Sequence, residues 1–164
     1  MNLKGLIKDV VSTLITVAVI AAAGYILTGA WPFMVAVQSG SMEPHIHKGD
    51  VVILVGKDRT KIVTYEEGMK IDYKSFGDYG DVIVYYPNGD TSRTPIIHRA
   101  IRWVEAGEKL PGGVIAKHSG YITKGDANSM YDQPFISQPV KPEWIVGVAK
   151  FRIPYIGYFR LIFG

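Results

Sequence analysis

Residues 81–86 read Asp-Val-Ile-Val-Tyr-Tyr and residues 94–104 read Thr-Pro-Ile-Ile-His-Arg-Ala-Ile-Arg-Trp-Val, and these two runs decide the fold class. Both are rich in β-branched and aromatic residues and are apolar at successive positions, which is typical of strands buried on both faces. Turn-forming residues separate them, as in Pro87-Asn88-Gly89-Asp90. The two runs therefore predict a sheet folded onto itself, as in a small barrel or sandwich.

Further runs of the same kind extend this pattern along the chain. They are Asp50–Val55, Gly113–Ala116, Tyr121–Thr123 and Trp144–Phe151. Residues 56–80 are more polar and are expected to form an inserted flap, and no helical period is visible in this part of the sequence. A stretch of about 110 residues is long enough to bury a core of this kind. We therefore expect residues 38–150 to form one mainly β domain.

A long apolar segment precedes the β-rich part. Residues 10–27 read VVSTLITVAVIAAAGYIL, and no charged side chain occurs between Val10 and Met42. A helix needs about 20 mainly apolar residues to cross a hydrocarbon layer of ~30 Å, and this run is long enough. The alternative is a cleavable signal peptide, but the apolar region of a signal peptide usually has only about 7–15 residues. We expect residues 1–37 to be a retained transmembrane anchor.

The charge distribution predicts how the chain lies on a membrane. Lys4 and Lys8 precede the apolar run and Glu43 is the first charge after it, so the N-terminus is expected in the cytoplasm and the domain outside. The basic surplus lies at the two ends, because the stretch between residues 9 and 150 has 13 basic and 14 acidic residues. This distribution predicts no nucleic-acid partner and favours a lipid bilayer, because the domain between the two ends has no clustered basic face. The tail, residues 151–164, is expected to lie at the membrane interface, with packing onto the domain as the alternative.

The turn after the apolar segment contains a candidate nucleophile. Residues 38–44 read Gln-Ser-Gly-Ser-Met-Glu-Pro, in which Gly40 permits a backbone geometry closed to other residues and Pro44 stiffens the exit. A serine on such a turn exposes its hydroxyl group and points its own N–H at a developing oxyanion. Taken alone, the segment is more typical of an ordinary polar turn than of a catalytic site.

A base and a carboxylate are available further along the chain. Serine needs a base within ~2.6–3.2 Å, and His98 lies inside the apolar run of residues 94–104, where a lone histidine can also be a core residue. An imidazole base needs a carboxylate that fixes its tautomer, and Asp126 and Asp132 follow in or near the turn Lys-Gly-Asp-Ala-Asn of residues 124–128. That turn alone is also a common local structure.

Four segments, in this order behind an apolar N-terminal segment, resemble the sequence boxes of the type I signal peptidases. They are Ser39–Pro44, Gly80–Tyr85, Ile97–Arg99 and Lys124–Asn128. The resemblance extends from the apolar segment to about Phe151. The bacterial branch has a lysine base where this chain has His98, so the chain resembles the archaeal and endoplasmic-reticulum branch, which uses serine and histidine with help from aspartate.

The resemblance implies a fold, a site and an activity. Ser41 matches the nucleophile and His98 the base, while Asp126 and Asp132 match the two aspartates of the last box. Asp132 is the expected partner of His98, although the two aspartates could exchange roles. Ser39 matches the position whose hydroxyl helps to form the oxyanion hole in the bacterial branch. The implied fold is a coiled β-sheet.

The implied activity is removal of signal peptides from secreted preproteins. It is expected at the outer surface of the cell membrane, or at the endoplasmic-reticulum membrane, without a cofactor or a metal. Preprotein signal peptides, the bilayer and accessory membrane subunits are the expected partners.

Two other functions stay open. His45 and His47 are separated by one residue, which on a strand places both side chains on the same face. They could bind zinc together with His98 or His118, as in a zinc hydrolase. A membrane-tethered binding domain without activity is the other alternative. The sequence has no cysteine, which excludes disulfides and thiolate catalysis and leaves the redox compartment undetermined.

Overall fold

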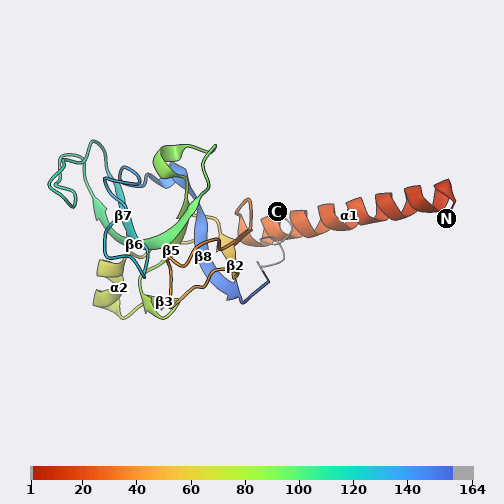
Figure 1. The fold of residues 1–164 in the computed structure, drawn as a ribbon, viewed down its shortest axis with the longest axis horizontal. Coiled ribbons are helices and arrows are strands. Elements are labelled where there is room, and N and C mark those ends of the chain that lie inside the picture. The colour runs from red at the N-terminus through yellow and green to blue at the C-terminus, as the bar shows by residue number, and fades with distance from the viewer. Residues whose placement is uncertain (1, 157–164) are drawn as a thin grey trace.

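A computed structural model describes residues 2–156 (Figure 1). Its helices and strands are α1 (Leu3–Thr28), β1 (Met34–Ala36), β2 (Val51–Val55), α2 (Tyr65–Ile71), β3 (Lys74–Ser75), β4 (Asp78–Tyr79), β5 (Val82–Tyr85), β6 (Ile96–Val104), β7 (Gly120–Lys124) and β8 (Ile145–Ile153). Six strands form an antiparallel sheet in the order β1-β2-β8-β5-β6-β7, and β3 pairs with β4 in a separate hairpin. The prediction of a mainly β fold is confirmed.

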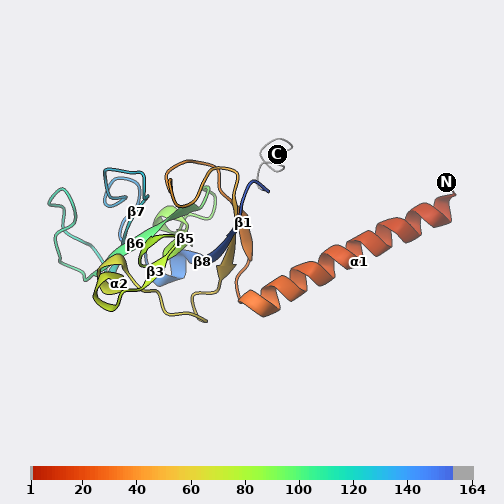
Figure 2. The same cartoon turned by 90° about the horizontal axis from the view of Figure 1, so that it is seen from below.

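Strand β5 lies inside the sheet and is buried on both faces. Val82 and Val84 pack into one apolar cluster, which also contains Met42, whereas Ile83 and Tyr85 pack into a second cluster. Successive strand residues point to opposite faces, so a run that is apolar at every position needs a cover on each side. The sheet supplies that cover by curling, as Figures 1 and 2 show.

Helix α1 projects away from the sheet as a long rod (Figure 2). The side chain of Asn2 caps its N-terminus by accepting a hydrogen bond of 2.7 Å from the N–H of Gly5. Gly29, with a φ of 69°, ends the helix in the left-handed conformation that glycine adopts most readily. The most apolar 18-residue window of α1 has a mean hydropathy of 2.3 and no buried residue. By length and composition, α1 can cross a membrane.

Hydrogen bonds join the end of α1 to the sheet. The N–H of Gly56 donates to the carbonyl of Thr28 over 2.8 Å, and Nη1 of Arg59 donates to the carbonyl of Ile26 over 2.6 Å. Six residues after the helix, Met34 begins β1, which pairs with β2. The sheet thus begins inside the segment that the sequence assigned to the anchor.

One expected strand is absent, and one helix was not predicted. Residues 113–116 do not form a strand, because Gly113 adopts a positive φ of 84° and Ile115 makes only an isolated bridge. Residues 56–80 contain helix α2, which begins with a capping box between Thr64 and Glu67. This helix has only seven residues, too few to show a helical period in the sequence.

The expected interfacial tail falls partly outside the described residues. Phe151–Ile153 belong to the end of β8, and Phe151 is 69% exposed. Residues 157–164 lie beyond the part of the chain that the structure describes.

Asp50 is a buried carboxylate that ties the start of β2 to the end of β8. It accepts hydrogen bonds from the N–H of His47 (3.0 Å), from Nη1 of Arg152 (2.9 Å) and from the N–H of Tyr155 (3.3 Å). Burial raises the pKa of Asp50, but these hydrogen bonds outweigh burial and hold the pKa below its ordinary value of 3.8. The carboxylate therefore stabilises the fold in its charged form.

We expect Asp50→Asn to lower the free energy of unfolding at neutral pH by about 1–3 kcal/mol, since each donor loses a charged acceptor. The pKa of Asp50 is lower in the folded chain, so its stabilisation is complete above the unfolded-state value of 3.8 and is lost as pH falls through the folded value. The difference in the free energy of unfolding between wild type and Asp50→Asn should therefore become smaller as the pH falls below 3.8. Urea unfolding in detergent at about pH 7, 5 and 3 tests this. A difference independent of pH would contradict it.

Candidate active site

Ser41 stands on a tight turn after β1, and the core holds this turn in place. Met42 and Ile46, which follow Ser41, are both fully buried. The N–H of Glu43 donates to the carbonyl of Gly40 over 3.1 Å, and the N–H of Ala127 donates to the carbonyl of Ser41 over 2.9 Å. The backbone of Ser41 is therefore fixed both by its own turn and by the loop that follows β7.

His98 comes from β6 and meets Ser41, which lies 57 residues earlier in the chain. Its Nε2 lies 3.0 Å from Oγ of Ser41, and its Nδ1 lies 2.6 Å from Oδ2 of Asp132. A carboxylate only accepts hydrogen bonds, so Nδ1 carries the proton and Nε2 accepts the hydroxyl hydrogen of Ser41. His98 is only 5% exposed. This is the arrangement in which a histidine can remove the proton of a serine.

The two candidate aspartates occupy different places. Asp132 is fully buried and contacts His98, whereas Asp126 accepts two hydrogen bonds from Arg99, at 2.8 and 2.6 Å, and contacts Nδ1 of His45 at 2.8 Å. The resemblance favoured Asp132 as the partner of His98, with Asp126 as the alternative. In the structure it is Asp132, and Asp126 makes no hydrogen bond with His98.

Arg99 connects Asp126 to the β3–β4 hairpin. Its guanidinium group is almost completely buried, and its Nη1 also donates to the carbonyls of Ser75 (2.9 Å) and Gly80 (2.8 Å). A buried charge of this kind is tolerated only when it is paired and hydrogen-bonded. Asp126 thus anchors the loop after β7, whose next residue, Ala127, holds the backbone of Ser41.

Ser39 lies beside the candidate nucleophile. Its Oγ is 3.2 Å from Oγ of Ser41, and its side chain is exposed. Because the hydroxyl hydrogen of Ser41 is directed to His98, the hydroxyl of Ser39 is the donor in this contact. Within residues 2–156 the backbone N–H of Ser41 makes no hydrogen bond, so two donors are available beside the attacking oxygen.

An open groove of about 850 Å³ runs past Ser41 and His98. Its lining residues come mainly from β1, β6 and the segments beside them, and include Met34, Val35, Ala36, Ser39, Val84, Ile96, Ile97, Asn128 and Ile136. Strand β1 lies at the edge of the sheet, where one side of its backbone is unpaired by the sheet. The groove can therefore take an extended, mostly apolar chain segment.

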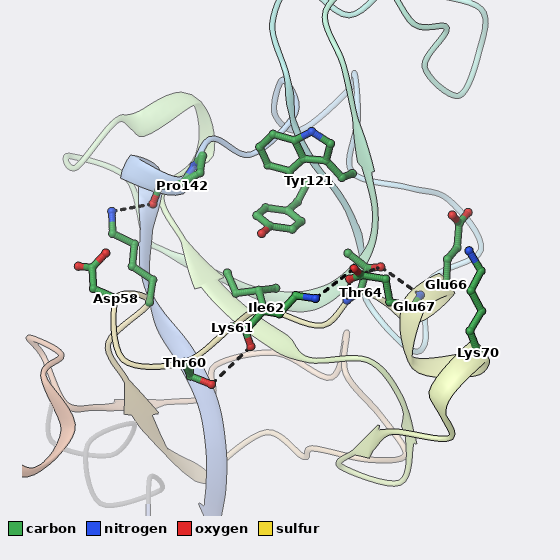
Figure 3. A pocket seen from close by; sticks show the side chains of 12 residues that line it. Asp58, Thr60, Lys61, Ile62, Thr64, Glu66, Glu67, Lys70, Tyr121 and Pro142 are labelled. Carbon is green, nitrogen blue, oxygen red and sulfur yellow. Dashed lines mark hydrogen bonds and ion pairs between the residues drawn. The ribbon is translucent and has the colours of Figure 1, made fainter.

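A second pocket, of about 660 Å³, lies beside α2 (Figure 3). Its lining contains both lysine and acidic side chains. The contacts there include the hydrogen bond of Thr64 with Glu67 and the ion pair of Lys61 with Glu67, at 3.6 Å. Its walls contain none of the residues that the sequence proposed for catalysis. The groove beside Ser41 is therefore the candidate active site.

The histidines do not assemble as a metal site. His45 contacts Asp126, Nδ1 of His47 lies 3.2 Å from Nη1 of Arg152, and the ring of His118 packs on Trp144. Among the residues that the structure describes, no group of three His, Cys, Asp or Glu side chains is placed to bind a metal ion. This placement gives no support to the zinc-hydrolase alternative.

Gly40 does not have the special backbone conformation that the sequence suggested. The glycine with no room for a side chain beside Ser41 and His98 is Gly125. Gly40 does not adopt a positive φ, and a Cβ added there would meet only the flexible side chain of Glu43, at 3.2 Å. A Cβ at Gly125 would lie 2.5 Å from the carbonyl oxygen of Ser41 and 2.9 Å from Nε2 of His98. The sequence signal for this glycine is its place in the Lys124-Gly125-Asp126 segment, directly before a candidate aspartate.

The class of protein follows from this geometry. A serine hydroxyl, an imidazole and a buried carboxylate are joined in series beside a groove, which is the arrangement of serine hydrolases. The site lies on a curled antiparallel sheet that carries an apolar helix of membrane-spanning length.

Comparison with known proteins defines the family. The chain is 31% identical over 140 residues to the signal peptidase complex catalytic subunit SEC11 of Lachancea thermotolerans, covering 83% of this chain and 68% of the relative. It is 34% identical over 133 residues to that of Yarrowia lipolytica, covering 79% and 62%, and 29% identical over 136 residues to that of Candida dubliniensis, covering 79% and 64%. No protein-family model matches the chain.

The chain belongs to the type I signal peptidases, in the endoplasmic-reticulum-type branch to which the SEC11 catalytic subunits belong. It spans a little under two thirds of the length of the Candida and Yarrowia relatives.

We expect Gly125→Ala to separate Ser41 from His98, because the new methyl group overlaps atoms of both residues. An error of about 1 Å in such a site costs on the order of 100-fold in rate. The rate at which Ser41 reacts with an alkyl fluorophosphonate measures the effect without a natural substrate. Gly40→Ala is the matched control on the other side of Ser41 and should keep a rate near that of wild type. Equal rates for the two variants would contradict the prediction.

Proposed function

We propose that this chain is a membrane-anchored serine endopeptidase that removes signal peptides from preproteins. One observation carries the proposal: Ser41, His98 and Asp132 are joined by contacts of 3.0 and 2.6 Å. The names of the relatives, which describe catalytic subunits of a signal peptidase complex, support the choice of substrate. Neither a zinc site nor a purely binding domain accounts for this arrangement of side chains.

The reaction follows from the tautomer of His98. Nε2 takes the proton of Ser41 while Oγ attacks the carbonyl carbon of the scissile bond, and the charge on Asp132 stabilises the resulting imidazolium. The imidazolium then gives its proton to the departing amine, which leaves an ester on Ser41. Water, deprotonated by His98, hydrolyses this ester and releases the signal peptide.

Two donors are placed to stabilise the negative charge that develops on the carbonyl oxygen. They are the backbone N–H of Ser41, which has no acceptor among residues 2–156, and the hydroxyl of Ser39, which is 3.2 Å from the attacking oxygen. Removing one donor of an oxyanion hole typically costs about 10²–10³ in rate, less than losing the nucleophile or the base.

The substrate binds as an additional strand along the groove. The short edge strand β1 leads directly to Ser41, so a peptide paired with it passes the nucleophile in an extended conformation. Small side chains at the first and third positions before the scissile bond enter shallow apolar spaces beside residues such as Val84 and Ile97, which line the groove.

The anchor brings the site to the membrane surface where preproteins emerge. Helix α1 spans the bilayer with Lys4 and Lys8 on the cytoplasmic side, and the bond from Arg59 to Ile26 holds the domain against the outer end of the helix. The relatives are named as catalytic subunits of a complex, which supports accessory membrane subunits as partners.

We expect Ser41→Ala and His98→Ala each to lower kcat by about 10⁴–10⁶, because each removes a participant in proton transfer. The assay follows cleavage of a model preprotein by purified full-length chain in detergent, with Ser39→Ala as a graded variant that retains measurable activity. Thermal unfolding of each variant confirms that the fold is kept. If Ser41→Ala cleaved as fast as wild type, the proposed function would be wrong.

The two aspartates should respond differently to substitution by asparagine. Asp132→Asn removes the charge that orients His98 and should lower kcat by about 10³–10⁴. Asp126→Asn leaves the buried Arg99 without its countercharge, so its main effect should be a loss of about 3–5 kcal/mol in the free energy of unfolding. Kinetics and urea unfolding on both variants test the assignment. If Asp126→Asn mainly lowered kcat and Asp132→Asn mainly lowered the free energy of unfolding, the assignment of the two aspartates would be wrong.

A further inference from the structure

Three donors converge on one oxygen of Asp132. Oδ2 accepts from Nδ1 of His98 at 2.6 Å, from the hydroxyl of Tyr85 at 2.8 Å and from the hydroxyl of Thr123 at 2.6 Å. The other oxygen, Oδ1, is buried and has no hydrogen-bond partner among residues 2–156. The oxygen that faces the candidate base is therefore also the one that both hydroxyl groups contact.

The register of the sheet places these donors together. Ile83 of β5 pairs with His98 of β6, so Tyr85, two residues after Ile83, lies on the same face as His98. Thr123 of β7 pairs with Ala100, two residues after His98, and lies on that face too. Three neighbouring strands thus each contribute one side chain around a single carboxylate.

The donor direction of both hydroxyls is determined by their surroundings. Nε2 of Gln133 donates to Oγ1 of Thr123 over 3.1 Å, and Oε1 of Gln133 accepts from the Thr123 N–H over 2.8 Å, so the hydroxyl hydrogen of Thr123 is directed to Asp132. Burial and the neighbouring Asp132 charge raise the pKa of Tyr85 well above its ordinary value, so its phenol remains a protonated donor.

We propose that Tyr85 and Thr123 are positioning residues of the hydrolytic reaction, which hold Asp132 against His98 and share its negative charge. This inference rests on the proposed function. Both side chains are fully buried and neither lines the groove, so they act through Asp132 and not on the substrate.

The physical consequence concerns proton transfer by His98. A carboxylate whose charge is spread over two hydroxyl donors attracts the imidazolium less strongly than one without them. The donors thereby moderate the attraction of Asp132 for the imidazolium, and they prevent Asp132 from rotating away from Nδ1 of His98. Removing a donor weakens both effects without changing the nucleophile.

The test is Tyr85→Phe, which removes one hydroxyl and keeps the ring. The expected result is a fall in kcat of about 3- to 30-fold with an unchanged KM, since Asp132 can then turn away from Nδ1 and His98 is less often oriented toward Ser41, and this loss of orientation outweighs the stronger attraction for the imidazolium. The acidic limb of the pH–kcat profile should move to higher pH, because the carboxylate without this donor attracts the imidazolium more strongly.

Tyr73→Phe is the matched control. The hydroxyl of Tyr73 also donates to a buried carboxylate, Oδ1 of Asp81, at 2.8 Å, but neither residue contacts His98 or Asp132. Its loss should reduce stability and leave the pH profile unchanged. A general effect of losing a tyrosine–aspartate bond would appear in both variants, whereas the proposed role appears only in Tyr85→Phe.

Thr123 provides a second, independent pair of variants. Thr123→Val removes the hydroxyl and should shift the acidic limb in the same direction, whereas Thr123→Ser keeps the hydroxyl and should restore the wild-type profile. The hydroxyls of Tyr85 and Thr123 are 3.0 Å apart and share one acceptor, so the effects of Tyr85→Phe and Thr123→Val should not add.

An NMR titration of the ¹⁵N-labelled His98 ring distinguishes failure of this inference from failure of the proposed function. It needs no substrate, and Tyr85→Phe should raise the pH at which the ring signals change. An unchanged titration and pH–kcat profile in both Tyr85→Phe and Thr123→Val would overturn the positioning role, even if wild type cleaves preprotein. If wild type cleaves nothing but the titration shifts, the hydroxyl network is supported and the proposed function fails.

Discussion

Strand β5 can exist only where both of its faces are covered, because Val82, Ile83, Val84 and Tyr85 are all excluded from water. Antiparallel pairing with β6 and β8 satisfies its backbone, and the curl of the sheet covers its side chains. The same pairing sets Ile83 opposite His98. The strand that forms the centre of the core therefore also determines where the imidazole stands, and a slip of one residue would turn His98 to the other face.

The serine reaches this imidazole from a different part of the chain. Its turn is held by the burial of Met42 and by the bond from Ala127 to the carbonyl of Ser41. Asp126 fixes the loop of Ala127 by pairing with the buried Arg99. The two aspartates thus have separate tasks in the geometry: one meets the base, and the other positions the backbone around the candidate nucleophile.

Burying so many polar groups is costly unless each is compensated. Arg99 is compensated by Asp126 and by the carbonyls of the β3–β4 hairpin, and Asp50 by donors from β8 and the turn before β2. Within residues 2–156, Asp132 receives all its side-chain hydrogen bonds on one oxygen. This asymmetry is why we attach a chemical role to its hydroxyl neighbours and not only a structural one.

Local patterns were sufficient to predict the apolar helix and five of the six strands of the main sheet, because each is visible within a short window of sequence. The candidates Ser41, His98, Asp126 and Asp132 came from the resemblance of four segments, taken together, to the type I signal peptidases. Strand β1, helix α2 and the absence of a strand over residues 113–116 were not predicted, since short elements have no clear period. The contact of Asp126 with Arg99 and His45, the close approach of Gly125 and the proposed role of Tyr85 and Thr123 could not be obtained from sequence. They depend on strand register and on contacts between segments far apart in the chain, and these are defined only when the sheet has curled around its own core.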